Sequence, residues 1–116
     1  MEENVHLTRE FAIQNCIKAA NTGVIWQRLD PEARAETIST LTQYVEESVE
    51  RAARGQRYDY ELTNEIAAGN LLGALNTTAV YSALDPELQT AAINTAVGYV
   101  KAMPNKDLGA NERAFH

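Results

Sequence analysis

The chain is poor in the residues that usually mark a catalytic or metal-binding site. Its 116 residues include one cysteine, Cys16, and two histidines, His6 and His116, which lie near the two ends. A single cysteine cannot form an intramolecular disulfide, and the sequence has no HExxH, CxxC, Walker or dinucleotide-binding glycine pattern. These absences favour a non-enzymatic protein with no cofactor and no metal, in which Cys16 serves as a packing residue.

Long hydrophobic runs and excess positive charge are missing as well. The longest uncharged run, residues 66–84, contains 19 residues but includes asparagine, threonine and serine, so it is too polar for a membrane span of about 20 apolar residues. A net charge of −6 makes a nucleic-acid partner unexpected. Residues 1–3 are acidic where a secretory signal peptide is basic, and together with the lone cysteine this predicts a cytoplasmic location.

What the sequence does contain is an internal repeat. The tetrapeptide Leu-Asp-Pro-Glu occurs at residues 29–32 and again, 55 residues later, at 84–87. At this offset 16 of the 42 positions from Asn4 to Val45 are identical without a gap. Average residue usage would give a background of roughly 6–7% identity, so the pattern indicates an internal duplication.

The duplication divides one helical domain, residues 1–116, into two similar parts. We call residues 4–54 repeat one and residues 59–103 repeat two. Beyond Pro104, which should end the last helix, we expect residues 104–116 to form a loose C-terminal tail.

Apolar residues in each repeat recur at helical spacing, and no strand pattern appears. The predicted helices cover residues of about 8–28, 31–53, 63–83 and 86–102. Asp30 and Asp85 are expected N-caps, followed by a proline that suits the first helical turn. Because only about two residues separate the helices of a repeat, each repeat should form an antiparallel αα-hairpin.

The sequence therefore predicts an all-α fold, a four-helix bundle made of two tandem αα-hairpins related by a pseudo-twofold axis. The first predicted helix of each repeat is least certain to be continuous at residues 21–23 and 76–78, because asparagine and threonine there are typical of helix ends. A kink or a break is the alternative at these places, and the prediction keeps one continuous helix.

Residues that are identical in the two repeats, except for one Trp/Tyr pair, form a stripe along the first helix of each repeat. The stripe consists of Ala12, Asn15, Ala19, Thr22, Trp26 and Leu29, matched by Ala67, Asn70, Ala74, Thr77, Tyr81 and Leu84. Since a twofold axis brings like against like, we predict that the two helices cross here and that Asn15 and Asn70 are buried and hydrogen-bonded, to each other or to the facing helix. The alternative is a cleft that binds a small, nucleotide-like molecule through Asn15, Thr22, Trp26, Asn70, Thr77 and Tyr81.

The two repeats differ in their charge. Residues 11–45 carry six charged side chains, the equivalent residues 66–100 carry two, and residues 88–100 carry none. An outer helix normally keeps a charged face, so an uncharged one indicates a covered surface. We predict contact with a protein partner or another copy of the chain through residues off the expected Ile93, Val97 and Val100 core stripe. These contact residues are Thr90, Ala91, Asn94, Thr95 and Gly98.

One acidic cluster, Glu46, Glu47 and Glu50 followed by Glu61 and Glu65, has a distinctive spacing. It resembles the EExxE…ExxD pattern of the all-α nucleotide pyrophosphatases, in which helical carboxylates hold Mg²⁺ around a triphosphate. Asn64 stands where that pattern has aspartate, and repeat two has no matching acids. A solvated helix face is the simpler interpretation.

The sequence thus favours a small, acidic, non-enzymatic binding protein of the adaptor or inhibitor type, acting through a protein–protein or self-association surface on repeat two. The first alternative is a protein that binds or sequesters a small molecule through the stripe. The second is the Mg²⁺-dependent hydrolase that the acidic spacing implies.

Overall fold

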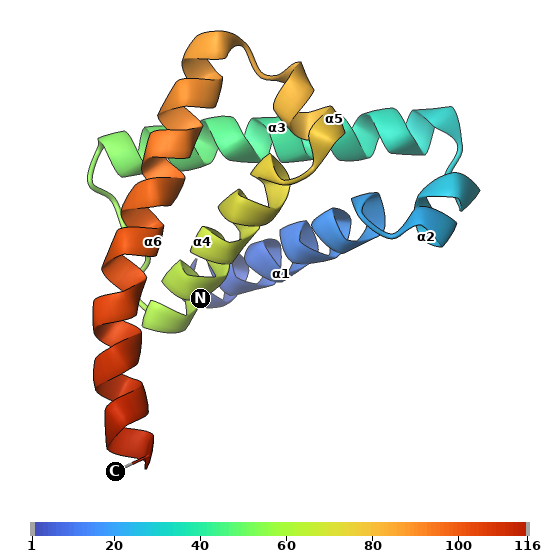
Figure 1. Ribbon diagram of the computed structural model, residues 1–116. Coiled ribbons are helices and arrows are strands. Elements are labelled where there is room, and N and C mark those ends of the chain that lie inside the picture. The colour runs from blue at the N-terminus through green and yellow to red at the C-terminus, as the bar shows by residue number, and fades with distance from the viewer. Residues whose placement is uncertain (1, 116) are drawn as a thin grey trace.

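Six α-helices make up the described part of the chain (Figure 1). The computed structural model describes the backbone of residues 2–115 and the side chains of residues 5–102. The helices are α1 (Glu2–Ala20), α2 (Gly23–Arg28), α3 (Pro31–Ala53), α4 (Glu61–Leu75), α5 (Thr78–Ala83) and α6 (Pro86–Phe115). No strand occurs within residues 2–115, so the predicted all-α fold is confirmed. None of the described helices combines the length and the apolar character that crossing a membrane requires.

The first helix predicted for each repeat is two helices in the structure. The chain breaks at residues 21–22, between α1 and α2, and again at 76–77, between α4 and α5. Thr22 and Thr77 adopt extended backbone there, with φ,ψ of −111°, 105° and −92°, 108°. Their hydroxyls donate to the carbonyl oxygen four residues earlier, at 2.7 and 2.9 Å. The prediction of one continuous helix was wrong because threonine here competes for the backbone groups at a helix end.

Both predicted N-caps are present. The Asp30 carboxylate accepts a hydrogen bond from the backbone N–H of Ala33 at 2.8 Å, and Asp85 accepts one from Leu88 at 2.8 Å. A proline begins α3 and α6 immediately after these caps. Gly55, with φ of +69°, ends α3 in the left-handed conformation that favours glycine.

Other local contacts recur at the same offset of 55 residues. The Arg34 Nε donates to the Trp26 carbonyl oxygen at 2.9 Å, and the Gln89 Nε2 donates to the Tyr81 carbonyl oxygen at 2.9 Å. Each contact ties the start of the long helix, α3 or α6, to the short helix before it. The two repeats therefore fold alike locally, even where their residues differ.

The repeats stack one on the next. The first helices, α1 and α4, lie side by side and run in the same direction, while α6 crosses in front of α3 (Figure 1). Helix α3 packs against α4, α5 and α6, but α1 and α6 are not among the closely packed pairs. The predicted four-helix bundle of two hairpins about a pseudo-twofold axis is not confirmed, since the described chain forms six helices and the pair α1 and α4 has the most extensive packing.

The core lies among α1, α3, α4, α5 and α6. Its fully buried members include Leu41, Tyr44, Val45, Leu71, Ala74, Val80 and Ala92. The core stripe predicted for α6 was wrong: Ile93, Val97 and Val100 are 41%, 43% and 46% exposed, and Ala92 and Ala96 are buried instead. Small alanine side chains let α6 approach its neighbours closely, and the larger apolar side chains then lie outside.

The predicted end of the last helix at Pro104 also differs from the structure. The backbone of α6 is helical to Phe115, through residues 104–115 of the predicted loose tail. A proline inside a helix removes one backbone hydrogen bond and costs about 3 kcal/mol or more, which opposes a helix without forbidding it. The side chains of residues 103–116 lie outside the described residues.

We expect Asp30→Ala and Asp85→Ala each to lower the free energy of unfolding by about 1 kcal/mol, because each removes the acceptor of an N-cap hydrogen bond. Urea unfolding followed by circular dichroism measures this loss. Asp59→Ala, which removes an exposed carboxylate from the segment between α3 and α4, is the control. Equal stability of all three variants and the wild type would contradict the assignment of the caps.

Candidate functional site

Helix α1 carries a carboxylate that is completely buried. Glu10 accepts hydrogen bonds from the Tyr44 hydroxyl at 2.6 Å, the Tyr58 hydroxyl at 2.8 Å and the Asn70 side-chain amide at 2.8 Å. The same amide of Asn70 also donates to the backbone oxygen of Glu10 at 2.8 Å. The three donors come from α3, from the segment between α3 and α4, and from α4. We call these four residues the Glu10 junction, because they join repeat one to repeat two.

Positive charge lies close to this buried carboxylate. The Arg9 guanidinium is 5.7 Å from the centre of the Tyr44 ring, and the Arg51 guanidinium is 4.7 Å from the centre of the Tyr58 ring. Arg9 also forms an ion pair with Glu47 on α3. A buried carboxylate is costly unless hydrogen bonds and nearby charges compensate it, and the Glu10 junction supplies both.

The two tyrosines are held in their protonated form. Burial first, and then the charge and the hydrogen bond of Glu10, raise the pKa of Tyr44 far above its ordinary value. Burial and the hydrogen bond to Glu10 also raise the pKa of Tyr58, to about 12. Both hydroxyls therefore remain hydrogen-bond donors at neutral pH. The Glu10 carboxylate is dry and engaged with these donors, so it acts as a structural group.

Asn15 and Asn70 occupy different environments. Asn70 is buried, as predicted, but it bonds Glu10, whereas Asn15 is exposed on the far side of α1. The predicted pairing of the two asparagines was wrong because α1 and α4 lie parallel with equivalent faces pointing the same way. The acidic residue that does bind Asn70 was not predicted as a site residue.

The other four residues of the predicted ligand site are also separated. Thr77 is buried and its hydroxyl accepts a hydrogen bond from the Asn21 amide at 2.8 Å, while its counterpart Thr22 is exposed. Trp26 and Tyr81 are half-buried, each within its own repeat. None of the six residues predicted to bind a ligand lines a described cavity.

The five residues predicted to make a contact all belong to α6. Thr90, Asn94 and Gly98 are exposed, and Ala91 and Thr95 are half-buried. The Thr95 hydroxyl donates to the Ala91 carbonyl oxygen of the same helix at 2.9 Å. The exposed three lie beside the uncovered apolar side chains of Ile93, Val97 and Val100.

A cleft of about 270 Å³ lies between the end of α3, the segment after it, α4 and α6. Its lining includes Arg51, Arg57, Asn64, Glu65, Ala68 and Tyr99. At the offset of 55, Glu65 and Tyr99 are the counterparts of Glu10 and Tyr44. Glu65 is exposed, whereas Glu10 is buried beneath the donors from α3 and α4. The Nη2 of Arg51 is buried without a hydrogen-bond partner among the described residues.

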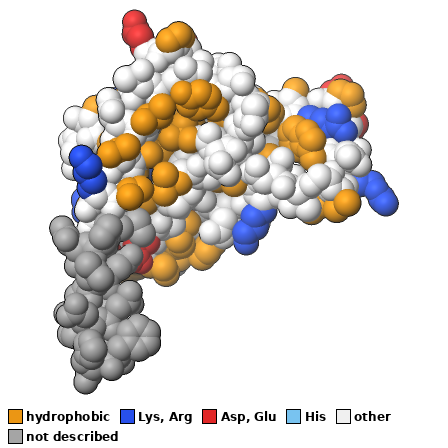
Figure 2. Space-filling model, viewed as in Figure 1, with side chains coloured by type: hydrophobic (Ala, Val, Ile, Leu, Met, Phe, Trp, Pro, Cys, Tyr) orange, Lys and Arg blue, Asp and Glu red, His pale blue; other side chains and the backbone are white. Residues whose placement is uncertain are grey.

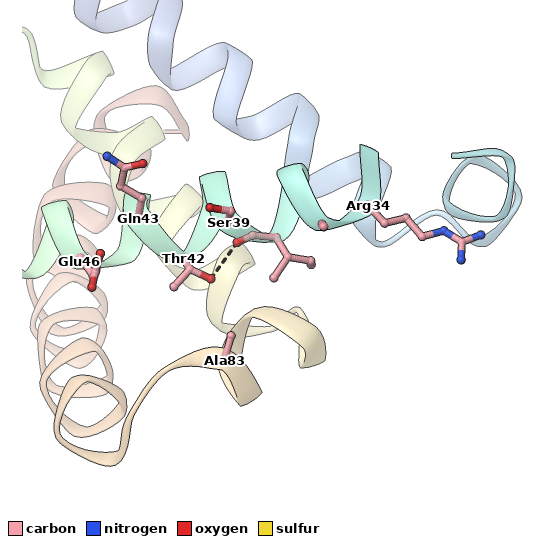
Figure 3. Close-up of a pocket in the computed structure, with 8 residues that line it drawn as sticks. Arg34, Ser39, Thr42, Gln43, Glu46 and Ala83 are labelled. Atoms are coloured by element: carbon pink, nitrogen blue, oxygen red, sulfur yellow. Dashed lines mark hydrogen bonds between the residues drawn. The ribbon is translucent and has the colours of Figure 1, made fainter. Parts of the chain in front are cut away.

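A second, open depression of about 770 Å³ runs along α3 beside the end of α5 (Figure 3). Its polar groups do not converge on a common point. The Thr42 hydroxyl donates to the Ile38 carbonyl oxygen of its own helix at 2.8 Å, and the Arg34 side chain extends away toward the carbonyl oxygens of Trp26 and Gln27. This depression therefore lacks the convergent polar groups that orient a small ligand.

The acids of the pyrophosphatase-like spacing are divided between two places. Glu46, Glu47 and Glu50 line an open groove together with two acids at the start of α6. Glu61 pairs with Arg57 at 2.6 Å, and Glu65 lies in the 270 Å³ cleft. Within the described residues, no three His, Cys, Asp or Glu side chains are grouped so as to hold a metal ion.

No family model matches the chain, and neither the curated proteins nor the solved structures give a match.

We expect Asn70→Leu to lower the free energy of unfolding by about 1–3 kcal/mol, because the buried Glu10 carboxylate loses one of its donors. Asn15→Leu makes the same change at the equivalent exposed position and should alter stability by less than about 0.5 kcal/mol. Chemical unfolding of the two variants measures the difference. Similar losses of unfolding free energy in both variants would contradict the finding that Asn70 is buried against Glu10 while Asn15 is exposed.

The raised pKa values predict how stability depends on alkaline pH. A tyrosine with a raised pKa contributes its full stabilisation below its ordinary pKa of about 10 and loses it as pH rises through the folded value. Stability should therefore fall from about pH 10 toward pH 12, the value for Tyr58. Tyr58→Phe should be less stable at neutral pH but show a shallower decline in this window. Urea midpoints across the window test this, with the exposed Tyr60→Phe as a control that keeps the wild-type slope.

Proposed function

We propose that the protein is a non-enzymatic helical binding protein that works through protein–protein contact on the outer face of repeat two. The outer face consists of the exposed residues of α4 and α6 that point away from repeat one. Its members are Leu72, Thr90, Ile93, Asn94, Val97, Gly98 and Val100.

One observation carries this proposal: the outer face is both apolar and uncharged. Ile93, Val97 and Val100 expose two-fifths or more of their surface, and residues 88–100 contain no charged side chain. Figure 2 shows hydrophobic side chains gathered over this side of α4, α5 and α6, with charged side chains at the margins. An exposed apolar area of this kind marks an interaction surface.

The internal repeat supports the same function. Two tandem repeats of equal local structure form a stack in which each repeat covers only its neighbour, as in other repeat proteins. Such stacks use broad surfaces for binding. An adaptor or an inhibitor, in a cytoplasmic setting, fits this arrangement and the acidic surface.

Binding of a small molecule through the stripe has weaker support, because its asparagine, threonine and aromatic side chains line none of the described cavities. The hydrolase alternative is likewise less favoured, since its acids lie in two separate places. Protein–protein contact is favoured over both alternatives because it would use the outer face, whose apolar side chains are exposed.

The test compares the wild type with Val100→Glu, which replaces one of the exposed apolar side chains of the outer face with a charged one. The wild type should assemble with itself in sedimentation experiments, or retain a protein from its cell of origin when immobilised. Val100→Glu should lose that contact while keeping its helical content. Val24→Glu makes the same change at a 73% exposed valine on α2, away from the outer face, and should behave as the wild type does. A wild type that forms no complex of either kind would contradict the proposal.

A further inference from the structure

We infer that the partner of the outer face is a second copy of this chain, docked head to tail. Repeat one of the second copy would occupy the place of a third repeat. This inference rests on the proposed function and specifies the occupant of its binding surface. The structure supports it by displaying the required contact once already, between repeat one and repeat two of a single chain.

The contact within the chain has two unlike sides. Repeat two contributes a docking face, the residues of α4 and α5 that are buried against repeat one. These are Ala67, Asn70, Leu71, Ala74, Thr77 and Val80. Repeat one contributes a receiving face on α1 and α3. Its members are Glu10, Ile17, Ile38, Tyr44 and Val45, which are buried or partly buried.

Each side of this contact has a counterpart that the other residues with described side chains, 5–102, leave uncovered. Repeat one has a vacant docking face, whose residues are exposed or half-buried: Ala12, Asn15, Cys16, Ala19, Thr22 and Ile25. Four of these six are identical to their buried counterparts in repeat two. Val80 is fully buried, whereas its counterpart Ile25 is 46% exposed.

Repeat two has a vacant receiving face, which forms part of the outer face and one side of the 270 Å³ cleft. It comprises Glu65, Leu72, Ile93, Tyr99 and Val100. Four of these five, all but Leu72, are identical to their counterparts in repeat one, and Val100 matches Val45. Val45 is fully buried and Val100 is 46% exposed, although α3 packs on α1 and α6 packs in the equivalent way on α4. The difference is the cover that a following repeat provides.

The polar groups of the two vacant faces are complementary. Within the chain, the Asn70 amide donates to the buried carboxylate of Glu10, beside the Tyr44 hydroxyl. Across two copies, Asn15 would reach Glu65 beside Tyr99 in the same way. Glu65 and Tyr99 already line one cleft, and that cleft is where the asparagine would enter.

Lys18, beside the vacant docking face, differs from its counterpart Gly73, and this difference affects the strength of the contact between copies. Gly73 lies so close to α1 that an added Cβ would be 2.9 Å from the Ile17 Cγ2. Lys18 occupies the equivalent position in repeat one. Its long side chain would have to lie along Leu72 with the ammonium group in water, so the contact between copies is looser than the one within the chain.

Unlike faces produce a heterologous contact, which extends from copy to copy instead of closing after two. The predicted contact residues Thr90 and Asn94 lie outside this contact, because their counterparts Ala35 and Ser39 remain exposed when repeat two covers repeat one. The surface that binds the second copy is therefore limited to the part of the outer face that carries Leu72, Ile93 and Val100.

A mixing experiment tests the inference directly. Asn15→Asp blocks the docking face by setting a second carboxylate against Glu65, and Val100→Glu blocks the receiving face. Ala12→Arg and Leu72→Glu are second variants for the same two faces. Sedimentation velocity is measured for each full-length variant, alone and in equimolar mixture, up to about 100 μM, above the micromolar dissociation constants of weak interfaces.

We expect the wild type to form species whose mass grows with concentration. Each blocked variant alone should sediment as a monomer, and the mixture should form a one-to-one dimer and nothing larger. Asn94→Arg should assemble as the wild type does, and Lys18→Ala should assemble at lower concentration because it removes the side chain that loosens the contact. The circular dichroism spectrum of Lys18→Ala should match that of the wild type, because a misfolded variant would also aggregate.

Two results would overturn the head-to-tail contact. If Asn15→Asp and Ala12→Arg assemble as the wild type does, the copies meet through the outer face alone, in a symmetric pair. If the wild type is monomeric at every concentration, a second copy is not the partner. Retention of another protein by the wild type but not by Val100→Glu would then leave the proposed function standing, and absence of that retention would remove both.

Discussion

The arrangement of the helices depends on one buried carboxylate. Glu10 is fully removed from solvent and accepts hydrogen bonds from Tyr44, Tyr58 and Asn70. A charged or polar group in such a place is stable only when its partners are all present, so the three segments that carry the donors must meet at one point. This requirement sets the register of α4 on α1 and places the segment after α3 over the end of both. The stacking of the repeats follows from it.

The sequence predicted correctly those features that depend on residues close together along the chain. The N-caps Asp30 and Asp85, the helix end at Gly55 and the helical character of both repeats depend on local hydrogen bonds and backbone preference, and all are present. The identical stripe was also correctly recognised as a packing surface in repeat two, where Asn70 and Thr77 are buried.

The sequence did not predict burial correctly where equivalent residues of the two repeats have different neighbours in the fold. Glu10 and Glu65 are the same residue at the same position of a repeat, yet one is buried and the other exposed. Nothing local distinguishes them, because the burial of Glu10 depends on Tyr44, Tyr58 and Asn70, which are distant in the sequence. The assumed pseudo-twofold axis turned like faces toward each other, whereas stacking turns them in one direction. The core of α6 was misassigned for a related reason: hydrophobicity favoured Ile93 and Val97, but close helix approach selected Ala92 and Ala96.

The short helix α2 has a consequence for how the molecule opens. It contains no buried residue, and it is attached to α3 by the Arg34 side chain, which donates to two of its carbonyl oxygens. Its counterpart α5 is fixed in the core by Val80. Regions with few buried contacts open separately from the rest of a protein, so the backbone amides of α2 should exchange with solvent hydrogen far sooner than those of α5. Two segments of the same length and position in a repeat thus belong to different cooperative units, and the first can rearrange without unfolding the core.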